Sequence, residues 1–222
     1  MIPEKFILTE NPFGHSRWNV NAALQPKELL RRLVNVHIAP SPLCRAAYTE
    51  KALKTSARTG AKQYVILGAG MDTFAFREPE FLAKHRVFDV DHPLTQADKL
   101  ERIARAGWTV PENLTFVPVD FTKDSLAERL IAAGFAPSVK SFFSWLGVTY
   151  YLSAEAIDTM QSAFSYSELE KLLEKHGFLI YELLTPDDIQ RDIIDKAGAD
   201  MKAFEHVNYC LAVRKGGKYV KN

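Results

Sequence analysis

Three short groups of residues in this 222-residue chain have the types and spacing of a nucleoside-binding site. A Gly-x-Gly turn, made by Gly68, Ala69 and Gly70, follows the apolar run YVIL. Asp91 ends the run VFDVD, and Asp120 with Phe121 ends the run FVPVDF. Glycines let a ligand approach the backbone closely, and carboxylates accept hydrogen bonds from ribose hydroxyls or from an exocyclic amine. An aromatic ring packs against a base.

The residues after the glycine turn indicate which ligand would bind. A dinucleotide fingerprint needs a third glycine at position 73, where this chain has Thr73. Asp72 stands at the same opening, and its carboxylate repels phosphate. A ligand with an adenosine but no phosphate fits better, so the turn is interpreted as a site for S-adenosylmethionine, whose sulfonium is positive. An NAD-type dehydrogenase is the competing interpretation, and a tight turn without any ligand is a third.

The two strand-ending acids have separate expected roles. Asp91 is placed to accept hydrogen bonds from the ribose, and Asp89 is expected on the opposite face of the strand. Asp120 is placed to accept from the adenine amine. The alternative for each of Asp91 and Asp120 is that it caps the helix that follows it. His92 is interpreted as structural, and no histidine spacing suits a metal, so no metal site is predicted.

The order of apolar and amphipathic segments predicts the elements that position these residues. Short apolar runs alternate with helical patterns, which is typical of an open α/β sheet with parallel strands. The predicted fold class is therefore α/β, with helices on both faces of the sheet. We expect one domain over 1–222, with a helical part at 1–60, a cofactor-binding core at 61–164, and a C-terminal helix and strands at 165–222. The strands are expected at 63–68, 85–92, 114–121, 141–152, 178–184 and 207–215, and the helices from Pro26 and at 44–60, 78–85, 93–107, 125–134 and 165–177.

The composition narrows the class of partner. The chain is 47% hydrophobic and 25% charged, with a net charge of +1, so nothing in its charge favours nucleic acid or an acidic membrane surface. No apolar run approaches the ~20 residues of a membrane helix, and the first residues lack a signal-peptide pattern. Cys44 and Cys210 have no metal or redox spacing. We expect a cytoplasmic protein with a small-molecule partner, without nucleic acid or membrane.

Four longer stretches resemble the leucine carboxyl methyltransferase-like family, and within it the bacterial S-adenosylmethionine-dependent methyltransferases. They read ILGAGMDTFAFR, FDVDHPLTQADK, VPVDFTKDSLAERLIAAGF and FFSWLGVTYYL. The resemblance is strong over 43–160 and looser over 165–215. It implies a Rossmann-like class I methyltransferase fold. It also implies that the turn from Gly68 to Gly70 holds the methionine part of the cofactor, Asp91 the ribose, and Asp120 with Phe121 the adenine.

The resemblance implies two further contacts. The family has an arginine before the first strand that pairs with the cofactor carboxylate; Arg45 is the chosen match and Arg58 the rival. Some members carry a glutamate just before a glycine at the end of the fourth strand. Leu146 occupies that position here, so the contact is either missing or replaced by packing from Trp145. Leu146 is counted among the expected cofactor-site residues.

The chain also departs from the family pattern. After the helix expected near Ser153, one central strand and much of the substrate lid are missing from the sequence. The sheet is expected to close differently, by segment 178–184 moving inward or by exchange between subunits, which leaves a homo-oligomer open. The expected reaction is O-methylation of a carboxylate or hydroxyl on a small molecule, with Tyr150 and Tyr151 as candidates to orient it. The alternative is a shortened homologue that binds cofactor without turnover, as a scaffold or dimer partner. No catalytic residue is assigned.

Overall fold

The computed structural model describes residues 39–147, 166–199, 201–204 and 207–216. The helix expected from Pro26 and the candidates Tyr150 and Tyr151 lie outside these residues. In chain order, the N-terminal half contains α2 (Pro40–Arg58), β1 (Gln63–Leu67), α3 (Phe74–Arg77), α4 (Pro79–Leu82), β2 (Arg86–Asp91), α5 (Pro93–Arg105), β3 (Leu114–Pro118), α6 (Leu126–Ala132) and β4 (Ser141–Trp145).

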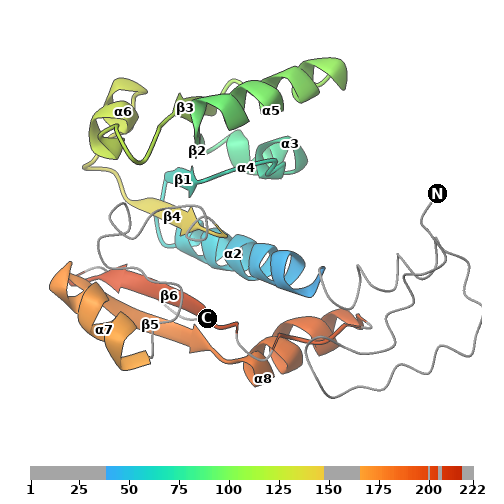
Figure 1. Cartoon of the computed structure of the whole chain (residues 1–222), viewed down its shortest axis with the longest axis vertical. Coiled ribbons are helices and arrows are strands. Elements are labelled where there is room, and N and C mark those ends of the chain that lie inside the picture. The colour runs from blue at the N-terminus through green and yellow to red at the C-terminus, as the bar shows by residue number, and fades with distance from the viewer. Residues whose placement is uncertain (1–38, 148–165, 200, 205–206, 217–222) are drawn as a thin grey trace, which may run out of the picture.

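Four of these strands form one parallel sheet in the order β3-β2-β1-β4 (Figure 1). The order reverses between β1 and β4, and ligands in such sheets bind beyond the carboxyl ends at this switch point. The strands begin within one residue of the predicted starts, because runs buried on both faces are almost wholly apolar. The predicted α/β fold class is confirmed.

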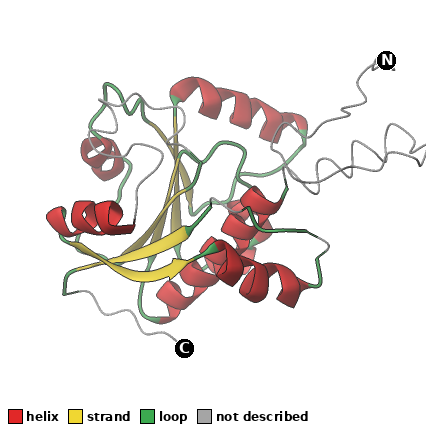
Figure 2. Ribbon diagram, turned by 60° about the horizontal axis from the view of Figure 1, so that its bottom comes forward, coloured by secondary structure: helices red, strands yellow, loops and turns green. Residues whose placement is uncertain are grey.

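Side chains alternate between two cores, one on each face of the sheet. Tyr64, Val87 and Phe142 pack on one face with Leu53 of α2 and with Phe74 of α3. On the other face, the core contains Val65, Phe88, Val90 and Val117 of the sheet together with Leu130 of α6. The sheet is thus covered by helices on both sides, and Figure 2 shows its strands between them.

The C-terminal residues form a second, antiparallel sheet. After α7 (Tyr166–Lys175), β5 (Phe178–Leu184) pairs with β6 (Tyr209–Arg214). Between them, a continuous helical stretch comprises α8 (Pro186–Ile189), the π-helical η3 (Gln190–Ile194) and the 3-10 helix η4 (Asp195–Ala197). These elements pack on α2 through a third core that contains Cys44, Ile189, Ile194 and Tyr209.

The expectation that segment 178–184 moves into the main sheet is wrong. Among the described strands, β5 pairs with β6 alone and β4 is an edge strand of its sheet. Phe178 and Leu179 are 38% and 45% exposed, whereas a strand inside a parallel sheet is buried on both faces. Tyr48 of α2 donates a hydrogen bond to Glu182 Oε2 at 2.8 Å, which helps to hold β5 against α2 instead.

Two helices differ from their predicted bounds. The first begins at Pro40, although the sequence 39–43 was expected to stay outside the helix, because proline is well tolerated in the first turn where its missing N–H has no partner anyway. The helix expected at 78–85 is the four-residue α4, and α3, a four-residue helix that was not predicted, precedes it on the other side of Glu78. No helix among the described residues is long and apolar enough to cross a membrane.

Candidate cofactor-binding site

The glycine turn after β1 requires glycine for its backbone conformation. Gly68 and Gly70 have φ angles of +66° and +50°, in the left-handed region that other residues rarely adopt. The amide of Ala69, between them, donates to the carbonyl of Val90 at 3.0 Å and so ties the turn to β2. A Cβ atom on Gly70 would meet no atom of the described residues within 4 Å. The protein therefore leaves open the space that a ligand would need.

Asp91 lies directly beside this turn, as the sequence predicted. Its Oδ2 accepts from the Gly70 amide at 2.5 Å, and its Oδ1 accepts from the His92 amide at 2.6 Å. Each carboxylate oxygen has a second lone pair, so Asp91 can still accept two hydrogen bonds from a ligand. Asp91 is not the helix cap: His92 caps α5, and its Nδ1 accepts from the Leu94 amide at 3.3 Å. This cap gives His92 a structural role, in agreement with its interpretation from the sequence.

Asp120 is held in the turn that follows β3. Its Oδ1 accepts from the Thr122 hydroxyl at 2.6 Å and from the Thr122 amide at 3.0 Å, and its Oδ2 lies 3.0 Å from Lys123 Nζ. The hydrogen bonds from Thr122 and Lys123 hold the pKa of Asp120 well below its ordinary value. Asp120 does not cap α6, which Ser125 does. Because His92 Nε2 lies 3.9 Å from Asp120 Oδ2, the two acid-bearing strand ends are adjacent.

Phe121 is half-buried and packs against the core on the α6 side of the sheet. This packing holds the Phe121 side chain against the core without requiring a ligand. The roles of Asp120 and Phe121 toward adenine stay a prediction.

The structure separates the two candidate arginines on α2. The Thr59 carbonyl, at the end of α2, accepts from Lys140 Nζ at 2.9 Å, so this end lies where β4 begins. Arg58 is close to that end, and its Nη2 donates to Thr55 at 3.2 Å. Arg45, three turns earlier on the helix, lies instead at the carboxyl ends of the strands.

The guanidinium of Arg45 packs against Gly147, just after β4. A Cβ atom at position 147 would lie only 2.8 Å from two guanidinium nitrogens, so a side chain there would displace the end of Arg45. Among the described residues, the guanidinium of Arg45 makes no hydrogen bond and no ion pair. A planar fork of N–H donors without a carboxylate is suited to bind one. Arg45, and not Arg58, therefore lies beside Gly147 after β4, and its contact with a cofactor carboxylate stays a prediction.

The end of β4 supplies the last predicted residue. Trp145 pairs in register with Leu67 of β1, and Leu146 and Gly147 follow it beyond the sheet. Leu146 is half-buried. The indole Nε1 of Trp145 is buried and has no hydrogen-bond partner within the described parts of the chain. Leu146 thus stands at the switch point, and its contact with a cofactor stays a prediction.

Sequence reasoning missed one polar pair beneath this site. Asp89 was expected on the face opposite Asp91, which is wrong because residues two apart along a strand share a face. Asp89 is buried under α5, where Lys99 donates to its Oδ2. Burial raises the pKa of Asp89 to about 6 despite the opposing effect of Lys99. The signal was present in the spacing of Gln96, Lys99 and Ile103, which places a lysine on the inward face of α5.

Comparison of the sequence with models of known protein families gives a match over more than half of the chain. The family model for leucine carboxyl methyltransferase matches residues 8–164. The chain belongs to the leucine carboxyl methyltransferase family. The family resemblance stated from the sequence is confirmed.

Similar proteins carry matching names. The chain is 37% identical to the "Putative S-adenosyl-L-methionine-dependent methyltransferase YktD" of Bacillus subtilis (strain 168), over 86% of this chain and 78% of that protein. Proteins with the same description from Parafrankia sp. (strain EAN1pec) and Mycobacterium marinum are 34% and 28% identical, over 59% and 87% of this chain. The matched regions are 40% and 62% of those two proteins, so the chain spans less than two thirds of their length. These names agree with the cofactor expected from the sequence.

The match to the Bacillus subtilis protein also bears on the shortened pattern. The aligned region is 237 residues long, which exceeds the 222 residues of this chain. Part of the aligned region of that relative therefore has no counterpart here. This agrees with the expectation that the chain lacks a segment that other family members contain.

Solved structures with partial likeness are methyltransferases as well. Precorrin-6y C5,15-methyltransferase from Geobacter metallireducens aligns with a TM-score of 0.36 and 17% identity, over 61% of this chain and 73% of that one. The mitomycin 7-O-methyltransferase MmcR aligns with a TM-score of 0.38 and 14% identity, over 83% of this chain and 60% of that one.

Proposed function

We propose that this chain is an S-adenosylmethionine-dependent methyltransferase that transfers a methyl group to a carboxylate or hydroxyl oxygen of a small-molecule acceptor. The observation that carries the proposal is the contact between Asp91 and the Gly70 amide, which unites an acid and an open glycine turn at the switch point of the sheet. Membership of the leucine carboxyl methyltransferase family and the names of the relatives support it.

The residues present fit such a cofactor. No described residue bonds to the guanidinium of Arg45, so its N–H groups can donate to the carboxylate of the cofactor's methionine part. Asp91 has lone pairs for the two ribose hydroxyls. Asp120 and Phe121 follow the neighbouring strand, where an adenine would lie in the proposed arrangement. Leu146 extends β4 on the other side of the glycine turn.

The charge of the site suits a cation better than an anion. Asp72 lies just past the turn, where its Oδ1 accepts from the Phe74 amide at 2.6 Å. Asp89 and Asp91 follow on β2, and Lys99 pairs with Asp89. Carboxylates near a bound sulfonium attract it, whereas they would repel the pyrophosphate of a dinucleotide.

When bound, the cofactor supplies a methyl group on a sulfonium that an acceptor oxygen can displace in line. The contribution of this chain is to bind both molecules, to align them and to exclude water. An acceptor carboxylate is already ionised near neutral pH and needs no base, whereas a hydroxyl benefits from one.

The first experiment is calorimetric titration of the purified chain with S-adenosylmethionine, with NADH as a control ligand. We expect micromolar binding of S-adenosylmethionine and none of NADH. Asp91→Ala should abolish binding, and Asp98→Ala, on the exposed face of α5, should not change it. A well-folded wild type that fails to bind S-adenosylmethionine would contradict the proposed function.

A matched pair of variants on α2 tests the assignment of the carboxylate contact. Arg45→Gln should weaken binding at least about tenfold, since a charge-assisted hydrogen bond is lost. Arg58→Gln makes the same chemical change at the other end of the helix and should leave the affinity unchanged. Equal effects of the two changes would argue against Arg45 as the ligand.

The acceptor class is tested by measuring S-adenosylhomocysteine formation with panels of small carboxylic acids, phenols and alcohols. For a carboxylate acceptor the rate should be flat above about pH 6, because the nucleophile is fully ionised there. For a hydroxyl acceptor the rate should rise with pH. Turnover with neither panel would contradict the O-methylation part of the proposal.

A further inference from the structure

The side chains of Asp89 and Lys99 form an ion pair in the interior, where they are 4% and 3% exposed. Lys99 Nζ donates to Asp89 Oδ2, and the other oxygen, Oδ1, is buried without a partner among the described residues. Gln96, one turn earlier on α5, donates from Nε2 to the backbone carbonyl of Asp89 at 3.0 Å. Side chains on two successive turns of α5 thus both bond to Asp89 of β2.

That residue lies two positions before the expected ribose ligand. β2 ends at Asp91, and α5 begins at Pro93, so the contacts from Gln96 and Lys99 fold the first turns of the helix back onto the strand end. The neighbouring segments hold the backbone there as well. The Ala69 amide donates to the backbone carbonyl of Val90 at 3.0 Å, and the Val119 amide donates to the backbone carbonyl of Asp91 at 2.8 Å. Asp91 Oδ1 accepts from the amide of His92, the N-cap residue of α5, so the Asp91 carboxylate is linked to the seating of α5.

The charges around Asp89 come from each element that packs on it. Lys99 faces it from α5, Asp72 from the turn after β1, and Asp91 from its own strand. Tyr64 faces it from β1, and its phenol bonds to Ser144 Oγ at 2.9 Å. Lys99 Nζ also lies 6.0 Å from the centre of the Phe116 ring.

An apolar pair is the alternative way to fill these two buried positions. Replacing a buried ion pair with well-packed hydrophobic residues is often neutral or stabilising, because both charges had to be desolvated. What an apolar pair lacks is direction, since a hydrogen-bonded pair fixes the helix relative to the strand in a way that non-directional burial does not. The polar pair is therefore better explained by positioning than by stability.

We propose that Lys99 and Asp89 are a positioning pair for the cofactor, which seats α5 on the end of β2 so that Asp91 presents its free lone pairs beside the glycine turn. This inference rests on the proposed function. The pair itself touches no ligand and acts through Asp91.

The test is calorimetry with S-adenosylmethionine on the full chain and on the double variant Asp89→Val/Lys99→Met, whose stability is followed by thermal unfolding. We expect the double variant to fold with a Tm close to that of the wild type but to bind at least about tenfold more weakly. The control is Asp98→Asn/Arg102→Met, which removes an exposed pair from the same helix and should leave the affinity unchanged.

The affinity is also measured between pH 7.5 and 5.5, a dependence that a merely structural pair would not produce. In the wild type the affinity should fall as Asp89 gains a proton and its hold on Lys99 weakens, whereas the double variant should lack this component. If the double variant does not fold, Asp89→Asn, which keeps size and an acceptor for Lys99, takes its place in both measurements.

Tight binding by a folded double variant, with the pH dependence of the wild type, would overturn the positioning role and leave the proposed function standing. For Asp89→Asn, which cannot gain the proton, an unchanged pH dependence of the affinity would have the same meaning. Absence of binding by well-folded wild type would overturn both.

Discussion

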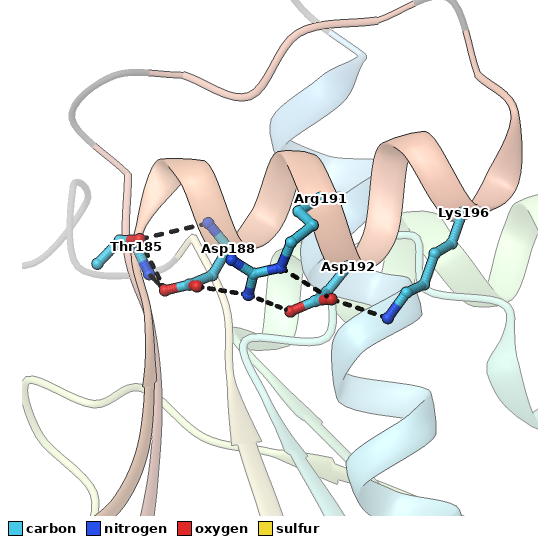
Figure 3. A network of polar contacts seen from close by, with 5 residues as sticks. All are labelled: Thr185, Asp188, Arg191, Asp192 and Lys196. Carbon is cyan, nitrogen blue, oxygen red and sulfur yellow. Dashed lines mark hydrogen bonds and ion pairs between the residues drawn. The ribbon is translucent and has the colours of Figure 1, made fainter.

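Two clusters of charged side chains in this protein use the same residue types in opposite surroundings. The buried pair consists of Asp89 and Lys99, which are 4% and 3% exposed under the glycine turn. The surface network runs along α8, η3 and η4 and consists of Thr185, Asp188, Arg191, Asp192 and Lys196 (Figure 3). In the surface network, Arg191 and Lys196 are 62% and 67% exposed, so water competes for every contact that they make.

The surface network is nevertheless well connected. Arg191 Nη2 lies 2.7 Å from Asp188 Oδ1 and 2.6 Å from Asp192 Oδ2, and Lys196 Nζ lies 2.8 Å from Asp192 Oδ1. Thr185 and Asp188 form a capping box at the start of α8, in which each side chain bonds to the backbone amide of the other. These contacts lie along one side of the helical stretch, as Figure 3 shows.

The two clusters shift carboxylate pKa values in opposite directions. Burial raises the pKa of Asp89 to about 6, because the desolvation of its charge outweighs the attraction of Lys99. Hydrogen bonds from Thr185 lower the pKa of Asp188, and hydrogen bonds from Arg191 lower that of Asp192, with little desolvation to oppose them. The comparison teaches that solvent access, rather than the number of ionic contacts, decides what a charge pair contributes.

The largest expected effect is that of Lys99→Met. It leaves Asp89 buried without its counter-charge and near two other carboxylates, so the free energy of unfolding should fall by about 3 kcal/mol or more at pH 8. The loss should be smaller at pH 5, where Asp89 takes up a proton. Denaturant unfolding at the two pH values measures both effects. The matched change Lys196→Met, in the surface network, should have little effect, and equal losses would erase the comparison.

The second expected effect concerns pH. Between about pH 4 and pH 6 the folded chain binds more protons at Asp89 than the unfolded chain does, so the stability contributed by this group falls as pH rises through that range, by about 3 kcal/mol in total. The stability of the wild type relative to Asp89→Asn should therefore increase between pH 7.5 and 4.5. For Asp188→Asn the relative stability of the wild type should change with the opposite sign, falling as the pH drops below the unfolded pKa of 3.8, because a lowered pKa stabilises the fold only while the carboxylate is ionised. A common sign would refute this assignment.

A smaller effect is expected at the start of α8. Thr185→Ala removes the hydroxyl that accepts from the Asp188 amide at 3.3 Å and donates to Asp188 Oδ2 at 2.7 Å. Loss of an N-cap typically costs about 1 kcal/mol, and denaturant unfolding measures it. Thr185→Ser retains the hydroxyl and should recover most of the loss. If Ser and Ala behave alike, the capping box has no energetic role.

The smallest effect is expected for Arg191→Gln, which breaks both ion pairs of this side chain in the surface network. Exposed pairs are weak and are screened by salt, so the change in Tm should be small at low salt and should disappear at 1 M NaCl. Thermal unfolding at both salt concentrations measures this. A large loss in Tm that persists at 1 M NaCl would mean that the surface network contributes to stability as a buried pair does, which contradicts the comparison.

The strands were predictable because each buried strand of a parallel sheet needs a short apolar run, and the chain contains these runs between clear helical patterns. The glycine turn and Asp91 were predictable for a related reason. Left-handed backbone at Gly68 and Gly70 requires glycine, and an acid at the end of the next strand must reach the same edge of the sheet. Local constraints of this kind are visible in the residue types themselves.

Other features could not be predicted from the pattern of residues in the sequence. Arg45 and Arg58 lie on one helix, and only the direction of α2 relative to β4 shows which of them reaches Gly147. The pairing of β5 was mispredicted because an apolar run of seven residues does not specify its neighbour. Asp89 was mispredicted because it was assigned to the strand face opposite Asp91, although residues two apart share a face. Its partner Lys99 lies ten residues away on another element.

By itself, the sequence determined the α/β class, the family, the order of the strands along the chain, and the glycine and acid positions of the candidate site. These follow from burial patterns and backbone conformations that each residue expresses locally. The tertiary structure alone decided which arginine faces the switch point, that β5 pairs with β6 outside the main sheet, and that one lysine is buried against Asp89. Each of those depends on packing between segments distant in the chain, where non-directional apolar burial allows several arrangements and only specific contacts select one.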